Sequence, residues 1–392
     1  MKKKKNIVIL GSSGSIGENA LDVVRQFKDR FRVIGLSVNA NIQRLKAQTL
    51  EFKPECVAVR DESQAKELAL KLRRKTKVLA SMDGICELAS LKAADVVLIA
   101  IAGSDAFFPL LSAIRARKTI ALANKESLVV AGPLIRAQAK KNKARVIPID
   151  SEQNAIFQCL QGYGLSMVER VYLTASGGPL VDYSQRHLQN VPLEKVLDHP
   201  RWKMGKKITV DSATMMNKGF EVIEAQQLFD LRLEQIKVLI HRQALIHSMV
   251  EFVDGSILAQ MGVTDMRLPI QYALTYPERW LNPRLRLDPL RMGELSFSKP
   301  DFHKFPCLGL AYEAARLGGI VPCALNAANE VAVRAFFEKK LAFGCIPKVI
   351  EKVIMKERFP KMDVTLDSIF QTSRVATASA QRWVQFYGKR GF

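Results

Sequence analysis

The chain lacks an apolar stretch long enough to cross a bilayer. Its longest run of apolar residues is the seven at positions 96–102, whereas a membrane-spanning helix needs about 20. The N-terminus, MKKKKNIVIL, has only four consecutive apolar residues before GSSGSIG, which is too few for the apolar core of a secretory signal. We therefore expect neither a membrane protein nor a secreted one.

Cysteine and histidine are also scarce, with six and five residues in a chain of 392. No two cysteines form a C-x-x-C pair, so the sequence indicates neither a disulfide framework nor a thiolate metal site. Five scattered histidines do not indicate a His-rich metal centre. This cysteine usage is typical of a reducing compartment, and we expect a cytoplasmic protein.

Acidic residues are outnumbered by basic ones, 38 against 59, which gives a net charge of +21. Such a charge attracts polyanions and can steer phosphorylated ligands toward the protein. The basic residues are scattered, however, and the only run of four covers residues 2–5. Because no nucleic-acid-binding motif accompanies them, we predict no nucleic-acid partner.

Short apolar segments alternate with helical periodicity over the first 150 residues. This alternation predicts a Rossmann-like, doubly wound parallel sheet in an α/β protein. Residues 96–102 suit a central strand that is covered on both faces. The predicted strands are residues 6–10, 31–38, 56–59, 77–80, 96–102 and 119–123, and the predicted helices include 43–52, 63–74 and 108–115.

The pattern changes beyond residue 150, where shorter strands are predicted at residues 171–174, 207–210, 238–240 and 256–260. A Pro-rich stretch without periodicity follows the first of these, which is typical of a lid. From residue 308 the pattern is mostly helical. We predict a nucleotide-binding domain (1–149), an α/β catalytic domain (150–280) with a mobile flap at about 177–206, a linker (281–306) and a C-terminal helical domain (307–392).

Three glycines, Gly11, Gly14 and Gly17, lie between the first strand and the first helix. Glycines there let the backbone approach a phosphate, and the helix N-terminus supplies N–H donors. Their G-x-x-G-x-x-G spacing differs from the standard fingerprint, but their place predicts dinucleotide binding. The second strand ends without the acidic residue typical of NAD sites, and Arg44 and Lys46 follow, which favours NADP. The alternative is that both are polar-face residues of the next helix.

Acidic residues end the predicted strand at 145–150. Side chains two apart on an extended segment point the same way, so Asp150 and Glu152 would face one cation. Oxygen ligands favour Mg²⁺ or Mn²⁺, although such pairs are often simply solvated. Farther along, Lys218 and Glu221 share one face of a helix predicted to begin near Asn217. They suit a metal site for a phosphorylated sugar, or form an ordinary helical ion pair.

Polar residues follow two further predicted strands. Asn124, Lys125 and Glu126 come after TIALA, and Ser176 comes after VYLT. The glycine-rich turn after Ser176 exposes N–H groups suited to a phosphate. We treat all four positions as candidate site residues.

Two groups of histidines have different surroundings. His199 lies with Trp202 in the Pro-rich stretch, where a functional role and a structural role are equally consistent with the sequence. His241 and His247 lie in the apolar segment VLIHRQALIHSMV. That context favours a structural role for both.

Several long motifs occur in a recognisable order. They are GSSGSIG, LANKESLV, DSEQNAIFQ, TASGGP, HPRWKMGKKITVDSATMMNKGFEVIEA, VLIHRQALIHSMV and ALNAANEVAV. On these motifs the chain resembles the 1-deoxy-D-xylulose 5-phosphate reductoisomerase family over essentially its whole length. The resemblance implies an NADPH- and divalent-metal-dependent enzyme that converts this sugar phosphate to 2-C-methyl-D-erythritol 4-phosphate in isoprenoid precursor biosynthesis. It also implies a homodimer.

The resemblance further implies roles for individual residues. The metal, Mn²⁺ or Mg²⁺ with Co²⁺ as a further candidate, is held by Asp150, Glu152 and Glu221. Lys125, His199 and Lys218 are implied as catalytic. Substrate binding falls to Ser151, Glu152, Ser176, His199, Trp202, Ser212, Asn217, Lys218 and Glu221. Cofactor binding falls to Gly11, Ser13, Gly14, Ser15, Ile16, Asn41, Asn124, Lys125, Glu126 and Gly205. The flap is implied to carry His199, Trp202 and Met204.

Two positions depart from the family pattern. Gln153 stands where many members have histidine, so this position is not an essential acid–base group here. Residues 38–41 read VNAN where members commonly have Ala-Gly-x-Asn. The alternatives to the family function are an NADP-dependent sugar-phosphate dehydrogenase without a rearrangement step, and a basic nucleic-acid-associated protein that borrowed the fold.

Overall fold

The computed structural model describes residues 4–72, 76–202, 205–357, 359–360 and 362–388. Met204 of the expected flap and the end of the helix predicted at 63–74 lie outside these residues. No helix within the described ranges is long and apolar enough to cross a membrane. The chain divides into two compact units. The first comprises residues 1–127, 135–157 and 265–286, and the second comprises 128–134, 158–264 and 287–392.

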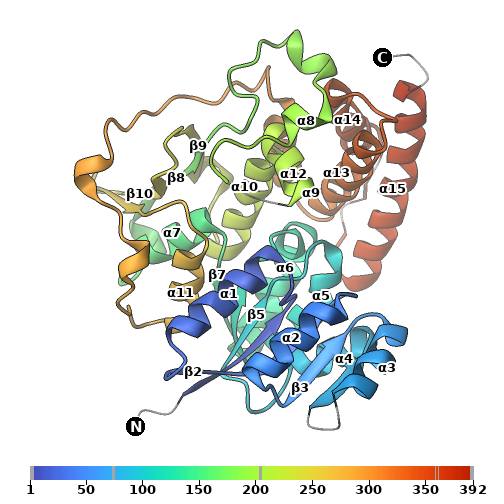
Figure 1. The fold of residues 1–392 in the computed structure, drawn as a ribbon. Coiled ribbons are helices and arrows are strands. Elements are labelled where there is room, and N and C mark those ends of the chain that lie inside the picture. The colour runs from blue at the N-terminus through green and yellow to red at the C-terminus, as the bar shows by residue number, and fades with distance from the viewer. Residues whose placement is uncertain (1–3, 73–75, 203–204, 358, 361, 389–392) are drawn as a thin grey trace. The chain divides into compact units, whose positions relative to one another are not determined.

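The first unit is built on a seven-stranded parallel sheet with the strand order β4-β3-β2-β1-β5-β6-β7 (Figure 1). The order reverses at β1, which confirms the predicted doubly wound sheet. Every residue of β3 and β5 is buried, which requires cover on both faces of the sheet. The strands are β1 (Lys5–Leu10), β2 (Phe31–Val38), β3 (Cys56–Val59), β4 (Lys77–Ala80), β5 (Val96–Ile99), β6 (Thr119–Leu122) and β7 (Arg145–Pro148).

Helices connect these strands. They are α1 (Ser15–Gln26), α2 (Ile42–Phe52), α3 (Glu62–Lys71), α4 (Ser81–Ala89), α5 (Phe107–Arg115) and α6 (Glu126–Asn142). A later helix, α11 (Arg267–Thr275), also belongs to the first unit and packs against α1. The periodicity did not predict α4, whose short sequence contains a glycine. A Cβ atom on Gly84 would lie 2.8 Å from the Cβ atom of Leu79, so this glycine permits close packing instead of ending a helix.

The second unit contains a four-stranded sheet with the order β11-β10-β8-β9. Its strands are β8 (Val168–Ala175), β9 (Ile236–Ile240), β10 (Ile246–Phe252) and β11 (Ile257–Met261). Strands β8 and β9 are parallel, and the other pairs are antiparallel. The remaining helices are α7 (Ser151–Cys159), which begins in the first unit, α8 (Leu193–Val196), α9 (Lys206–Ala213), α10 (Met216–Phe229), α12 (Pro306–Leu317), α13 (Val321–Phe337), α14 (Ile346–Lys356) and α15 (Leu366–Gly388).

The C-terminal part of the second unit is helical, as the apolar stripe predicted. Helix α13 packs against α12, α14 and α15 (Figure 1). Its buried residues include Leu325, Ala328, Ala332 and Phe336, which recur at helical spacing. This packing surrounds α13 with helices and buries most of its length.

Two local predictions are wrong. Residues 207–210 were predicted as a strand but lie in helix α9. Gly205 directly precedes the helix and its carbonyl oxygen accepts from Thr209, and Lys207 pairs with Asp211 one turn later. Strand β7 ends at Pro148, and α7 begins at Ser151. For residues 207–210 (KITV), the alternation of apolar and polar residues is too short to distinguish a strand from a helix.

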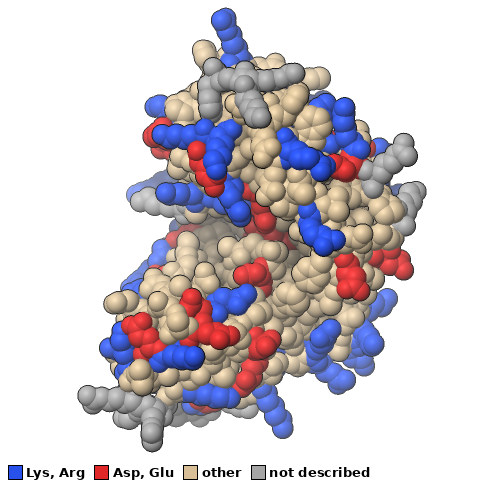
Figure 2. Space-filling view, turned by 90° about the vertical axis from the view of Figure 1, so that its right-hand side faces the viewer, with Lys and Arg blue, Asp and Glu red and all other residues tan. Residues whose placement is uncertain are grey.

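The positive charge is spread over the surface. On the face shown in Figure 2, Lys and Arg side chains are interspersed with Asp and Glu side chains. Many of the basic residues form exposed ion pairs, such as Arg242 with Asp182 and Lys77 with Glu87. On this face the charges of both signs are therefore mixed, and the absence of a nucleic-acid partner stays a prediction.

Candidate active site

The glycine loop between β1 and α1 has no room for a side chain at Gly11 or Gly17. Gly11 has φ +84°, and a Cβ atom there would lie 2.5 Å from the carbonyl oxygen of Ala100. A Cβ atom on Gly17 would lie 2.4 Å from the carbonyl oxygen of Gly11. Gly14 precedes α1 without a capping side chain, so the first turn offers backbone N–H groups to an anion. The predicted contacts Ser13, Gly14, Ser15 and Ile16 form this turn.

The turn after β2 has its own hydrogen bonds. The Asn41 side chain accepts from the backbone N–H of Arg44 at 3.0 Å and caps α2. The Arg44 guanidinium donates to both carboxylate oxygens of Glu18, with 2.6 Å between Nη2 and Oε2. Asn41 was predicted as a cofactor contact, and it also stabilises the helix beside the loop. Arg44 is engaged by an acidic residue of α1.

Asn124 fixes the start of α6. It is buried, and its amide nitrogen donates to the carbonyl oxygens of Ile101 and Gly103 at 3.0 and 2.9 Å, and to Glu126 at 3.1 Å. Its amide oxygen accepts from the N–H of Ser127 at 2.8 Å. These bonds use the whole hydrogen-bonding capacity of the side chain. Asn124 therefore shapes the edge of the sheet where cofactor contacts are predicted.

Lys125 and Asp150 form a buried ion pair within the first unit. Lys125 follows β6, and Asp150 follows the neighbouring strand β7. Glu152 lies in the first turn of α7, and the Ser151 hydroxyl donates to its carboxylate. The expectation that Asp150 and Glu152 share one side of an extended segment is therefore wrong. The two carboxylates instead lie at and just before a helix N-terminus, where the backbone favours negative charge.

A second ion pair is buried on α10. Glu221 is 1% exposed, and its carboxylate accepts from Asn217 Nδ2 at 2.6 Å and pairs with Lys218, which is 4% exposed. An ordinary helical ion pair lies at the surface and contributes little to stability. Burying two charges is costly. The buried pair therefore differs from an ordinary, solvent-exposed helical ion pair and is typical of a functional site.

The Ser176 loop rests on α9. Ser176 follows β8, and its hydroxyl lies 3.5 Å from Nε2 of His199. Gly178 has φ +72°, and a Cβ atom there would lie 2.6 Å from the carbonyl oxygen of Ser212. Only glycine permits this contact. The fold of the second unit thus brings Ser176, His199 and Ser212, predicted from separate motifs, into one region.

His199 is oriented by the backbone N–H groups that follow it in the chain. Its Nδ1 accepts from the N–H groups of Trp202 at 2.9 Å and Arg201 at 3.2 Å. Burial lowers the pKa of His199 below its usual 6.5, which favours the neutral ring. Because Nδ1 is an acceptor, the ring proton lies on Nε2, toward Ser176. Gly205, a predicted cofactor contact, is exposed and precedes α9.

The two histidines of the apolar segment are buried. The Nε2 atom of His241 accepts from the N–H groups of Leu245 and Ile246, and its ring stacks on Phe297 at 4.8 Å. His247 is 5% exposed, and its ring lies 6.4 Å from that of Trp202. These contacts agree with a structural role for His241.

Two buried polar residues near the site were missed from the sequence. Asp211, on α9 directly before Ser212, accepts from Asn329 Nδ2 at 2.8 Å and from Lys207 Nζ at 2.7 Å. Asp211 is 2% exposed, and Asn329, on α13, is 0% exposed. The sequence could have indicated Lys207 as a partner of Asp211, because the two residues lie one helical turn apart. The contact with Asn329 spans 118 residues, and no local pattern reveals it.

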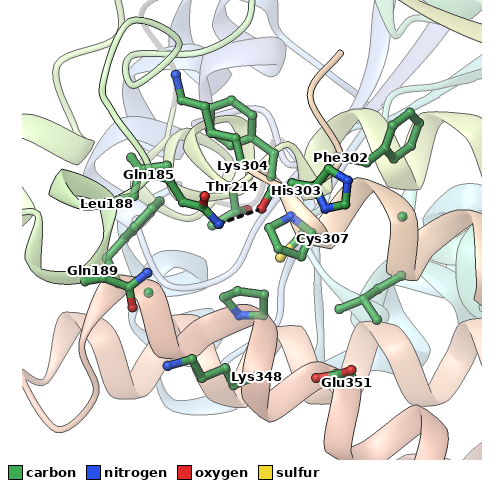
Figure 3. A pocket seen from close by; sticks show the side chains of 17 residues that line it. Gln185, Leu188, Gln189, Thr214, Phe302, His303, Lys304, Cys307, Lys348 and Glu351 are labelled. Atoms are coloured by element: carbon green, nitrogen blue, oxygen red, sulfur yellow. Dashed lines mark hydrogen bonds between the residues drawn. The ribbon is translucent and has the colours of Figure 1, made fainter.

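A separate pocket of about 500 Å³ lies in the second unit (Figure 3). It is lined by residues from three regions, 185–189, 302–310 and 343–351, together with Thr214. Gln185 donates to the carbonyl oxygen of His303 at its edge, at 3.5 Å. None of the predicted site residues lines this pocket, so it is distinct from the candidate site.

Comparison with known families gives three matches. Residues 7–132 match 1-deoxy-D-xylulose 5-phosphate reductoisomerase, residues 146–229 match the C-terminal domain of that enzyme, and residues 261–379 match the DXP reductoisomerase C-terminal domain. A 1-deoxy-D-xylulose 5-phosphate reductoisomerase from Thermodesulfovibrio yellowstonii is 49% identical over 350 residues, 89% of this chain and 92% of the relative. One from Caldanaerobacter subterraneus is 48% identical over 93% of this chain and 95% of the relative.

Solved structures agree with these matches. The reductoisomerase from Zymomonas mobilis in complex with NADPH has a TM-score of 0.92 and 39% identity, over 98% of this chain and 100% of that chain. A DOX-P reductoisomerase in complex with NADPH, fosmidomycin and magnesium has a TM-score of 0.92 and 39% identity, over 99% of this chain and 100% of that chain.

Proposed function

Because the chain belongs to the 1-deoxy-D-xylulose 5-phosphate reductoisomerase family, we propose that it converts 1-deoxy-D-xylulose 5-phosphate to 2-C-methyl-D-erythritol 4-phosphate in isoprenoid precursor biosynthesis. It is an NADPH-dependent oxidoreductase with an isomerase step, and it requires a divalent cation. The observation that carries this conclusion is the 49% identity over 89% of the chain.

Asp150, Glu152 and Glu221 are proposed to hold the divalent cation. All three are carboxylates, which suit hard ions such as Mg²⁺ and Mn²⁺, and Co²⁺ is a further candidate. Lys125 pairs with Asp150 and Lys218 with Glu221, and these lysines favour the ionised carboxylates that a metal ion requires. The donor set therefore fits the cation.

The loop from Gly11 to Gly17 is proposed to bind the pyrophosphate of NADPH, since the first turn of α1 has no capping side chain and offers its backbone N–H groups to an anion. Asn41, Asn124, Lys125, Glu126 and Gly205 are proposed as further cofactor contacts. When bound, the cation polarises the oxygens of the substrate and NADPH supplies the hydride.

The chain's own residues are proposed to bind and orient the sugar phosphate. The neutral His199 ring donates from Nε2, and Lys218 offers a buried positive charge, so both suit anionic oxygens. Lys125 is the proposed third catalytic residue. The flap segment, residues 177–206, excludes water when closed. The proposed substrate contacts are Ser151, Glu152, Ser176, His199, Trp202, Ser212, Asn217, Lys218 and Glu221.

A homodimer is proposed through the sheet of the second unit. Strand β11 is an edge strand, and apolar side chains near it are exposed. They are Tyr163, Leu165, Met167, Val253, Ile257 and Leu258. Grouped exposed apolar residues favour association.

The six cysteines are thiols, which supports the proposed cytoplasmic location.

Purified enzyme given 1-deoxy-D-xylulose 5-phosphate should consume NADPH, and a chelator should stop the reaction. Restoration by Mn²⁺ or Mg²⁺, with 2-C-methyl-D-erythritol 4-phosphate as the product, supports the proposal. Metal-independent oxidation of NADPH without a rearranged carbon skeleton would instead identify a simple sugar-phosphate dehydrogenase. Salt-sensitive DNA binding without NADPH oxidation would identify the nucleic-acid-associated alternative.

A further inference from the structure

Strands β2 and β3 end side by side at the carboxyl edge of the parallel sheet. Val38 pairs with Val59, the N–H of Arg60 donates to the carbonyl oxygen of Val38 at 3.0 Å, and that of Asp61 donates to Asn39 at 3.2 Å. Arg60 therefore lies beside the turn that follows β2. Dinucleotide-binding folds place the adenosine ribose at this point of the sheet.

The turn after β2 has no group that distinguishes the two nicotinamide cofactors. It reads Asn39, Ala40 and Asn41, without the acid that binds an unphosphorylated ribose or a base that binds a 2′-phosphate. Arg44 follows, but Glu18 already accepts from its guanidinium through both oxygens. A phosphate would have to compete with that carboxylate for Arg44.

Arg60, unlike Arg44, is not paired with a carboxylate among the described residues. Its Nε atom is buried and has no hydrogen-bond partner among the residues that the structure describes. The Oδ1 atom of the adjacent Asp61 accepts from Ser63 Oγ at 2.6 Å and from the N–H of Gln64 at 2.9 Å. A buried donor without a partner is rare and calls for an explanation.

Unlike Arg44, Arg60 has no carboxylate partner among the described residues, so its place beside this turn suits a bound phosphate. The guanidinium is permanently charged, and its planar fork donates two parallel hydrogen bonds to phosphate oxygens. We propose that Arg60 binds the 2′-phosphate of NADPH and thereby sets the preference of this enzyme for NADPH over NADH. This inference rests on the NADPH dependence in the proposed function, and it assigns a residue that the glycine loop does not include.

The experiment measures binding by calorimetry on the full-length protein without substrate, so that turnover plays no part. The probes are NADPH, NADH, 2′,5′-ADP and 5′-AMP. The variants are Arg60→Ala, Arg60→Lys and Arg44→Ala. The control is Arg32→Ala, which also removes one positive charge from this sheet, but at the amino end of β2 where Arg32 pairs with exposed Glu55.

Arg60→Ala should raise the Kd of NADPH and 2′,5′-ADP roughly 10- to 100-fold, the usual effect of losing a hydrogen bond to a charged group. The Kd of NADH and 5′-AMP should change little, and Arg60→Lys should lose less affinity than Arg60→Ala. The inference is overturned if Arg60→Ala weakens all four ligands equally, or if Arg44→Ala alone produces the selective loss. Absence of NADPH binding by the unaltered enzyme would contradict the proposed function itself.

Discussion

Asn329→Leu tests whether the C-terminal helices hold helix α9, which carries the proposed substrate contact Ser212, in place. Leucine has a similar size but removes the hydrogen bond from Asn329 to the buried carboxylate of Asp211. A hydrogen bond to a charged group contributes about 1.5–3 kcal/mol. The amide oxygen of Asn329 is itself buried without a partner among the described residues, and removing it offsets part of the loss in the single variant.

A double-mutant cycle isolates the pair energy from this offset. The cycle combines Asn329→Leu with Asp211→Leu, and urea denaturation measures the free energy of unfolding of each variant. Lys207, the other partner of Asp211, has a side chain that is 31% exposed and can turn to solvent. We expect a coupling energy of about 1.5–3 kcal/mol. Asn329→Leu should also raise KM for the sugar phosphate, because Ser212 follows Asp211 directly.

Asn326→Leu is the matched control. Asn326 lies one turn earlier on α13, is 3% exposed and donates only within its own helix, to Glu330 at 3.1 Å. Its replacement should leave KM unchanged. A coupling energy below about 0.5 kcal/mol, the range of independent sites, would refute the reasoning, as would equal changes in KM for the two leucine variants.

Further predictions address the metal, the cofactor loop and the flap. Asp150→Asn or Glu221→Gln should abolish turnover while NADPH binding, measured by calorimetry, stays near normal; near-normal turnover would contradict the metal assignment. Gly17→Ala should weaken NADPH binding, because its methyl group would collide with the Gly11 carbonyl oxygen, and an unchanged Kd would show that the loop can shift. Burial lowers the pKa of His199, so its stabilisation of the proposed flap is fully present above about pH 6.5 and is lost as the pH falls. Fluorescence of Trp202, in a variant without the other two tryptophans, should report a midpoint below that value, and a higher midpoint would be inconsistent with the buried neutral ring.

Local side-chain patterns explain why much of the fold of this protein could be predicted from its sequence. Strand β3 was predicted with its observed bounds, since covered parallel strands favour short continuous apolar runs. Gly11 and Gly17 marked a tight turn between the first strand and the first helix, since larger residues do not fit at these two positions. The motifs that carried the family resemblance were contiguous segments, and the comparisons agree with them.

The predictions that failed depended on contacts distant in the sequence or on short ambiguous segments. Residues 207–210 were taken for a strand because four residues cannot distinguish the two periodicities. The pairing of Asp211 with Asn329 and that of Arg44 with Glu18 exist only because the chain folds back on itself. Sequence alone determined the doubly wound class of the first unit and the chemistry of the residues, since both follow from local side-chain patterns. Tertiary structure decided which charges are already matched and which remain available to a ligand, because this depends on neighbours that only folding brings together.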